Sequence, residues 1–119
     1  MEYKDINFSG ELMDLLNKFK LPFSDMMLDI VPPQKGIYVF WSEADEVLYI
    51  GVAESSEGLE KEINLHKRAE HFMNIKNISK FQIQVCPNPR DHQGKLLNDF
   101  VRHFGVLPRY NRTTTDDIE

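Results

Sequence analysis

The sequence predicts an α/β domain of the α+β type, with a small three-stranded sheet, mixed or antiparallel, and helices packed on it. Three short segments have the β-branched and aromatic composition of strands, and two later segments repeat their apolar residues at helical spacing. The chain has 119 residues, of which 41% are hydrophobic and 28% are charged. This length and composition are typical of one globular domain that builds its core without disulfides.

Residues 1–34 are predicted to form a helical extension that precedes the main domain. One apolar stripe recurs at i, i+3, i+4 and i+7, with Ser9 placed as the N-cap. The residues of this stripe are Leu12, Leu15, Leu16 and Phe19. A second apolar cluster, residues 26–31, ends at Pro32 and Pro33 and is expected to pack in the core.

The main domain is predicted over residues 35–112 and begins with a β-hairpin. Residues 37–41 and 47–50 are the two strands, and the polar residues 42–45 form the loop. Gly51 is expected to end the second strand, before an exposed polar loop.

The second half of the domain is predicted as helix, strand and helix. Residues 60–73 carry apolar side chains at helical spacing, and residues 81–85 alternate apolar and polar side chains as a half-buried strand does. Residues 92–104 form the last helix, which Gly105 ends. An acidic tail, residues 113–119, follows.

The formal net charge of −5 hides an uneven distribution. Residues 61–112 carry ten lysines and arginines against four acidic residues, whereas residues 1–60 carry four against twelve. Two interpretations are open: ordinary solvated faces, or a basic face for a polyanion. Because no apolar run approaches the roughly 18 residues that span a bilayer, we expect no membrane partner.

The single cysteine, Cys86, is expected to be a small buried residue in a reducing cytoplasm. Zinc is disfavoured, because His66 and His71 are five positions apart and five is the wrong spacing for one helical face. Trp41 is interpreted as a core or rim aromatic residue.

Two tripeptides and two later segments carry a family resemblance. Gly36-Ile37-Tyr38 lies on the first strand of the hairpin and Tyr49-Ile50-Gly51 on the second. Residues 64–72 and the sequence Pro108-Arg109-Tyr110-Asn111 follow in order. Over residues 36–112 the chain resembles the GIY-YIG nuclease family. The resemblance implies metal-assisted hydrolysis of nucleic-acid phosphodiester bonds, with DNA the expected partner.

Four residues are predicted to be catalytic. Tyr38 and Tyr49 can project from paired strands onto one face of the sheet. Arg68 offers a planar fork to phosphate oxygens, and His71 lies at i+3 from it on the predicted helix, so both can face one pocket. The resemblance implies that a tyrosine assists the attacking water and that the arginine stabilises the phosphate.

The predicted nucleic-acid contacts come from the basic part of the chain and its closing segment, since lysine and arginine supply most of the affinity for phosphate. They are Lys67, Lys76, Arg109, Asn111 and Arg112.

The last helix departs from the family. The resemblance implies a metal-binding glutamate there, and alignment of Phe100, Val101 and Phe104 with the apolar positions places Leu97 at its site. No metal ligand is therefore assigned, and Mg²⁺ or Mn²⁺ is expected only if the protein is catalytic. The alternative is a catalytically impaired module that binds nucleic acid or, through the N-terminal extension, a protein.

Overall fold

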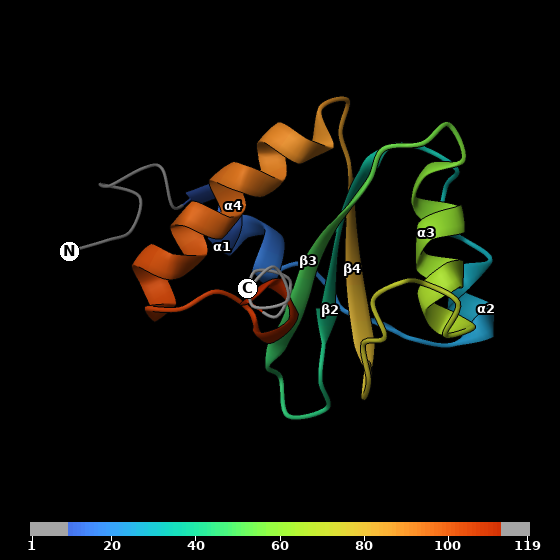
Figure 1. The fold of residues 1–119 in the computed structure, drawn as a ribbon, viewed down its shortest axis with the longest axis horizontal. Helices are drawn as coiled ribbons and strands as arrows, with labels where there is room; N and C mark the ends of the chain where they lie inside the picture. The colour runs from blue at the N-terminus through green and yellow to red at the C-terminus, as the bar shows by residue number, and fades with distance from the viewer. Residues whose placement is uncertain (1–9, 113–119) are drawn as a thin grey trace.

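The computed structural model describes residues 10–112, in which helices cover both faces of one β-sheet (Figure 1). The predicted cap at Ser9 and the tail 113–119 lie outside these residues. In chain order the elements are α1 (Gly10–Leu16), β1 (Leu21–Pro22), α2 (Asp25–Leu28), β2 (Gly36–Trp41), β3 (Val47–Ala53), α3 (Gly58–Lys67), β4 (Lys80–Val85) and α4 (Pro89–Phe104). No helix of residues 10–112 is both long and apolar enough to cross a bilayer.

The sheet has four strands in the order β1-β4-β2-β3, and every neighbouring pair is antiparallel. The α+β class is confirmed, but the predicted count of three strands is wrong. The additional strand is β1, in which Leu21 and Pro22 pair with Phe81 and Lys80 of β4. Two residues are too few to show alternation, and a proline is tolerated only because β1 lies at the edge of the sheet.

The hairpin and the last helix follow the prediction with adjusted ends. β2 and β3 pair as predicted, although β3 continues past Gly51 to Ala53. α4 begins at Pro89, and Gly105 ends it in a left-handed conformation with φ 85°.

One core lies between the sheet and the pair α1 and α4, on the left in Figure 1. The leucines of the N-terminal stripe are buried there, so the predicted extension shares its core with the sheet. α1 ends at Leu16, however, and Phe19 is 81% exposed rather than part of the stripe. Trp41 is buried, as predicted, and its indole Nε1–H donates to Gln82 at 2.7 Å.

The second core lies between the sheet and α2 and α3. Its largest side chains from the sheet are Tyr38, Phe40 and Phe81. Of the predicted cluster at residues 26–31, Leu28 and Val31 are buried, but Met26 and Ile30 are exposed because α2 is only one turn long.

α3 ends at Lys67, six residues before the predicted end. Ala69 adopts φ 58°, and the N–H groups of Ala69 and Glu70 bond back to the carbonyls of His66 and Leu65. These two bonds close a helix as a Schellman motif does, although glycine is the usual residue at the left-handed position. The chain then leaves the helix axis, so His71 lies in a loop and not on the helix face that carries Arg68.

Cys86 follows the last residue of β4 and is partly buried, so the prediction of a buried cysteine is only partly correct. Partial burial raises the pKa of its thiol. Cys86 packs against the edge of the core between the sheet and the pair α1 and α4.

Candidate functional site

Tyr38 and Tyr49 lie on the same face of the sheet, as predicted. Tyr38 pairs with Gly51 and Phe40 pairs with Tyr49, so the two tyrosines are diagonal neighbours on β2 and β3. Their ring centroids are 6.0 Å apart. The two tripeptide motifs therefore form one continuous wall beneath α3.

Tyr38 is completely buried, with 0% of its surface exposed. Its Oη lies 3.1 Å from His66 Nε2 and donates to Glu62 Oε2 at 3.3 Å. Burial, followed by the proximity of Tyr49 and Glu62, raises the pKa of Tyr38 well above its ordinary value. Tyr38 is therefore a phenol at neutral pH, where it donates a hydrogen bond and does not act as a base.

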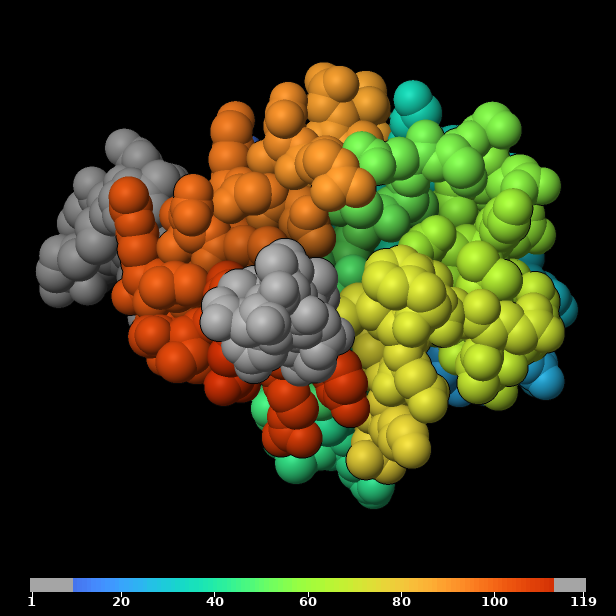
Figure 2. Space-filling model, viewed as in Figure 1, coloured from blue at the N-terminus to red at the C-terminus, as the bar shows by residue number. Residues whose placement is uncertain are grey.

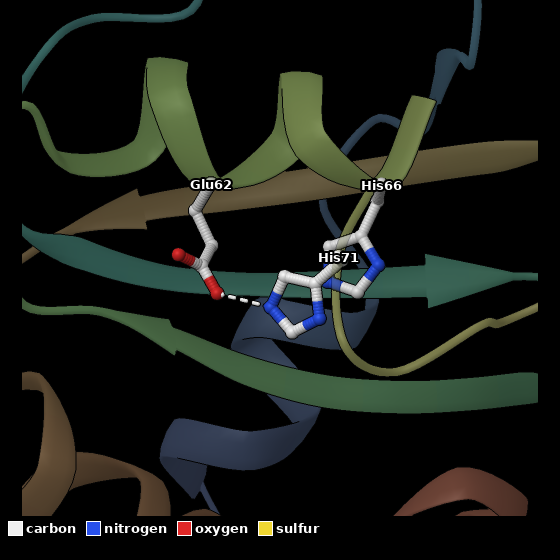
Figure 3. Close-up of side chains that lie close together, drawn as sticks. All are labelled: Glu62, His66 and His71. Carbon is white, nitrogen blue, oxygen red and sulfur yellow. Dashed lines mark hydrogen bonds and ion pairs between the residues drawn. The ribbon is translucent and has the colours of Figure 1, made fainter. Parts of the chain in front are cut away.

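His71 forms a close pair with Glu62, with 2.6 Å between Nε2 and Oε2 (Figure 3). The other ring nitrogen, Nδ1, accepts the backbone N–H of Met73 at 3.0 Å. A nitrogen that accepts cannot carry the proton, so the neutral imidazole carries it on Nε2 and donates to Glu62. Both nitrogens of His71 are therefore in use.

His66 completes the hydrogen-bonded cluster. Its Nδ1 is buried and has no hydrogen-bond partner within residues 10–112. An unpaired buried N–H is rarer than an unpaired acceptor, so the favoured tautomer places the proton on Nε2, facing Tyr38. Burial, and then His71, lowers the pKa of His66 to about 3. His66 then donates a hydrogen bond to the Tyr38 hydroxyl. Tyr38 and His71 both donate to Oε2 of Glu62.

A cavity of about 560 Å³ opens beside this cluster, at the free edge of β3. In Figure 2 the green atoms of β3 and the residues after it lie between the orange atoms of α4 and the yellow atoms of the loop after α3. The lining residues are Tyr49, Val52, Glu54, Ser55, Glu62, His71, Phe72, Met73, Arg90, Gln93, Leu97, Leu107 and Asn111. Glu62 joins the buried cluster to this cavity, while Tyr38 lies behind the wall.

The hydroxyl of Tyr49 is available to a ligand. Tyr49 lines the cavity, and its hydroxyl makes no hydrogen bond within the described residues. Burial and the nearby Glu62 raise the pKa of Tyr49, against a smaller lowering by Arg90. Tyr49 is therefore also a hydrogen-bond donor at neutral pH.

Arg90, at the start of α4, contributes a cation to the cavity wall. Its Nε and Nη2 bond both oxygens of Glu54 at 3.0 and 2.8 Å. This contact lowers the pKa of Glu54 and raises that of Arg90. Glu54 is thereby neutralised by its partner, whereas Oε1 of Glu62 accepts no hydrogen bond within residues 10–112.

Neither Glu62 nor Arg90 was predicted from the sequence as a site residue. A weak signal existed for each, because Glu62 is one turn before His66 and Arg90 precedes Leu97 by two turns on the helix face that includes Gln93. Helical spacing alone does not predict which residues lie across the sheet from Glu62 and Arg90.

Arg68 does not join the tyrosines. It is the C-cap of α3, its guanidinium bonds Glu70 at 3.1 Å, and it is not among the residues that line the cavity. The structure therefore brings Tyr38, Tyr49 and His71 together and leaves Arg68 on the exposed surface. The early end of α3 causes this separation.

The predicted nucleic-acid contacts are spread over several surfaces. Lys67 pairs with Asp25 of α2 at 3.6 Å, and Lys76 lies in the exposed loop after α3. Arg109 and Arg112 line a different cavity, of about 470 Å³, against α1 and α4, where Arg109 also pairs with Glu46. These four side chains do not form one patch around the tyrosines.

Asn111 lines the cavity but its side chain has a structural role. Its amide accepts the N–H of Ile50 at 3.0 Å and donates to the Ile50 carbonyl at 3.1 Å. Gln93 donates to the same carbonyl at 2.9 Å. These side chains satisfy backbone groups at the open edge of β3, which would otherwise be free to pair with another strand.

The family-implied metal does not fit at residue 97, because Leu97 contributes an apolar side chain to the cavity wall. Glu62 fits better, since Mg²⁺ and Mn²⁺ are commonly held by one or two carboxylates together with water and phosphate oxygens. Its side chain is 27% exposed and lines the cavity, and its Oε1 accepts no hydrogen bond within residues 10–112. Glu62 is therefore the residue that would hold a hydrated divalent cation.

A histidine-ligated metal does not fit. One ligand atom from each of Glu62, His66 and His71 lies within 4.8 Å of the others, so the loop places together two histidines that helical spacing keeps apart. The histidine rings, however, are stacked with centroids 3.8 Å apart, and a metal-binding histidine normally donates its other N–H to an acceptor. Nδ1 of His71 instead faces the N–H donor of Met73.

Neither known family models nor curated proteins match this chain.

Proposed function

We propose that this protein is a divalent-cation-assisted hydrolase of nucleic-acid phosphodiester bonds, of the GIY-YIG type, with DNA as the expected substrate. The observation that carries the proposal is the position of Glu62. Tyr38 and His71 hold Oε2 of its carboxylate, Oε1 accepts no hydrogen bond within residues 10–112, and the side chain lines a cavity that also contains Tyr49 and Arg90.

Each cavity residue has a role that its chemistry suits. The guanidinium of Arg90 has the planar geometry that matches two phosphate oxygens, and the Tyr49 hydroxyl can donate to a third oxygen or to the attacking water. In this role Arg90 replaces Arg68 as the phosphate-binding arginine. Arg90 would exchange part of its contact with Glu54 for the phosphate.

Tyr38 and His71 are positioning residues in this proposal. Both donate a hydrogen bond to Oε2 of Glu62, which leaves Oε1 free to face the cavity. Because burial fixes Tyr38, the carboxylate has one orientation before the ligand arrives.

Glu62 would hold the cation, which supplies charge neutralisation on the phosphate and a more acidic bound water. The cavity wall offers no second carboxylate without a partner among residues 10–112, since Glu54 is bonded to Arg90. We therefore expect weak binding of the cation by the free protein.

The test is a nicking assay on supercoiled plasmid, with Mg²⁺ or Mn²⁺, that compares the wild type with Glu62→Gln. Glu60→Gln is the matched control, because Glu60 is an exposed residue of the same helix and the charge change is identical. We expect Glu62→Gln to lower the nicking rate by at least about 100-fold and Glu60→Gln to leave it within about twofold. Equal rates for wild type and Glu62→Gln, or a wild type that does not nick, would overturn the proposal.

A second candidate is a module of the same fold that binds nucleic acid without cutting it. The apolar Leu97 in the cavity wall favours this candidate. It predicts oligonucleotide binding that resists chelation of divalent cations, with no nicking. A protein partner at the leucine stripe of α1 is less favoured, since those leucines are buried in the core.

The expected cytoplasmic location remains part of the proposal. It is supported by the single cysteine, which can form no disulfide within the chain.

A further inference from the structure

Phe72 stands out among the exposed side chains of the cavity. It is 87% exposed, the highest value of any large apolar residue described, and it lines the cavity beside Tyr49 and Glu62. A ring this exposed stabilises the fold little through burial, and most of its surface is open to a ligand at the cavity.

The ring of Phe72 is supported from one side. It stacks on His71 with a centroid separation of 4.5 Å and an interplanar angle of 30°. His71 in turn stacks on His66, at 3.8 Å and 17°. The three rings form a column that begins in the buried cluster and ends at the surface.

The column is fixed at its centre. His71 is bonded through one nitrogen to Glu62 and through the other to the backbone of Met73, so its ring cannot rotate without breaking a hydrogen bond. Phe72 therefore packs on a rigid neighbour, and less conformational entropy is lost when a ligand covers its outer face.

We infer that Phe72 is a stacking platform for an unpaired nucleobase of the strand whose phosphate enters the cavity. This inference rests on the proposed function. The ring is next to the residues proposed to bind phosphate, and each nucleotide carries a planar base beside its phosphate. Stacking of bases on aromatic side chains is tolerant of sequence, because every base has a π face.

The test measures binding of a short single-stranded DNA and of the same strand with abasic sites, by fluorescence anisotropy with Ca²⁺ in place of Mg²⁺. For the unmodified strand we expect Phe72→Ala to weaken binding by between about 5-fold and about 150-fold. For the abasic strand we expect wild type and Phe72→Ala to bind alike. Phe72→Leu should resemble Phe72→Ala, because it keeps an apolar side chain without a π face.

Two further variants sharpen the test. Phe19→Ala removes a phenylalanine that is 81% exposed and does not line the cavity. This variant should leave the affinities for the unmodified and the abasic strand within about twofold of wild type. Phe72→Trp should keep the affinity, and its indole fluorescence should be quenched by the unmodified strand alone, while Trp41 stays buried.

The outcomes separate the two proposals. If the wild type binds and nicks DNA but Phe72→Ala binds the unmodified strand equally well, the stacking inference is wrong and the proposed function stands. The same holds if Phe72→Ala weakens binding of both strands equally. A wild type that binds neither strand overturns both.

Discussion

The phenol ring of Tyr38 lies directly over Gly51 on the neighbouring strand. A Cβ built at residue 51 would come within 2.3 Å of the ring carbon Cζ of Tyr38. The glycine of the second tripeptide therefore provides the space that the tyrosine of the first occupies. Without it, the hydroxyl of Tyr38 could not reach Glu62 and His66 along its present path.

This contact predicts that Gly51→Ala destabilises the protein. Because the ring is completely buried and cannot swing aside, we expect a loss of about 1–3 kcal/mol in the free energy of unfolding. Urea denaturation measures it. Gly94→Ala is the control, since no atom lies within 4 Å of a Cβ there, and it should stabilise α4 by about 0.5–1 kcal/mol. Equal effects at the two glycines would contradict the packing described here.

Removal of the hydroxyl should affect the stability of the protein differently at Tyr38 and at Tyr49. Tyr38→Phe leaves a buried nitrogen of His66 and a half-buried oxygen of Glu62 with one partner fewer, so we expect a loss of about 1–3 kcal/mol of stability. Tyr49→Phe removes a hydroxyl that has no hydrogen bond within the described residues, and should change stability by less than about 0.5 kcal/mol. Thermal or urea unfolding of the pair checks this difference, and a larger loss for Tyr49→Phe would contradict it.

His66 makes stability depend on pH. Its pKa is lowered from the ordinary 6.5 to about 3 in the folded protein, chiefly by burial. As the pH falls below 6.5, the unfolded chain binds a proton at this residue and the folded protein does not. As the pH falls from 6.5 to about 3, the free energy of unfolding should therefore decrease, and this group contributes a slope of up to about 1.4 kcal/mol per pH unit.

Urea unfolding at pH 7 and pH 5 measures that slope. His66→Gln should lose less stability over this interval than the wild type, because it has no proton to gain. His92→Gln, at a half-buried histidine on α4, is the comparison. If His66→Gln and the wild type show the same slope, His66 does not remain neutral in the folded state.

Alanine substitutions of Arg90 and Arg68 should have different effects on oligonucleotide binding. Arg90 lines the cavity and Arg68 does not, so we expect Arg90→Ala to weaken oligonucleotide binding by about 10-fold and to reduce the salt slope by about 1. Arg68→Ala should leave both quantities nearly unchanged. Fluorescence anisotropy over a series of salt concentrations makes the measurement. A larger loss for Arg68→Ala would return that residue to the role predicted from the sequence.

Leu97→Glu should add a second carboxylate opposite Glu62. We expect tighter Mn²⁺ binding, together with a loss of about 1–3 kcal/mol of stability because Leu97 packs against the core beneath α4. Electron paramagnetic resonance measures the bound Mn²⁺ independently of activity. Leu97→Gln is the control of equal size without the charge. Equal Mn²⁺ affinity in the two variants would show that residue 97 does not reach the cation.

The hairpin, the common face of Tyr38 and Tyr49, and the last helix that Gly105 ends were all predicted correctly from sequence patterns. These features depend on local periodicity: side chains alternate along a strand, recur every three to four residues along a helix, and stop at a glycine that accepts a left-handed conformation. Such patterns are visible within a few neighbouring residues, so no knowledge of the rest of the chain is needed.

The charged groups that lie beside the tyrosines could not be predicted in this way, because they come together only when the chain folds. The left-handed residue that follows α3, Ala69, is not a glycine and gives no sequence signal, yet it turns the chain so that His71 reaches Glu62 while Arg68 stays outside. The start of α4 brings Arg90 to the same cavity from a segment far along the chain, and β1 joins the sheet through only two residues. These contacts join residues distant in sequence, and their formation depends on packing across the sheet rather than on local spacing.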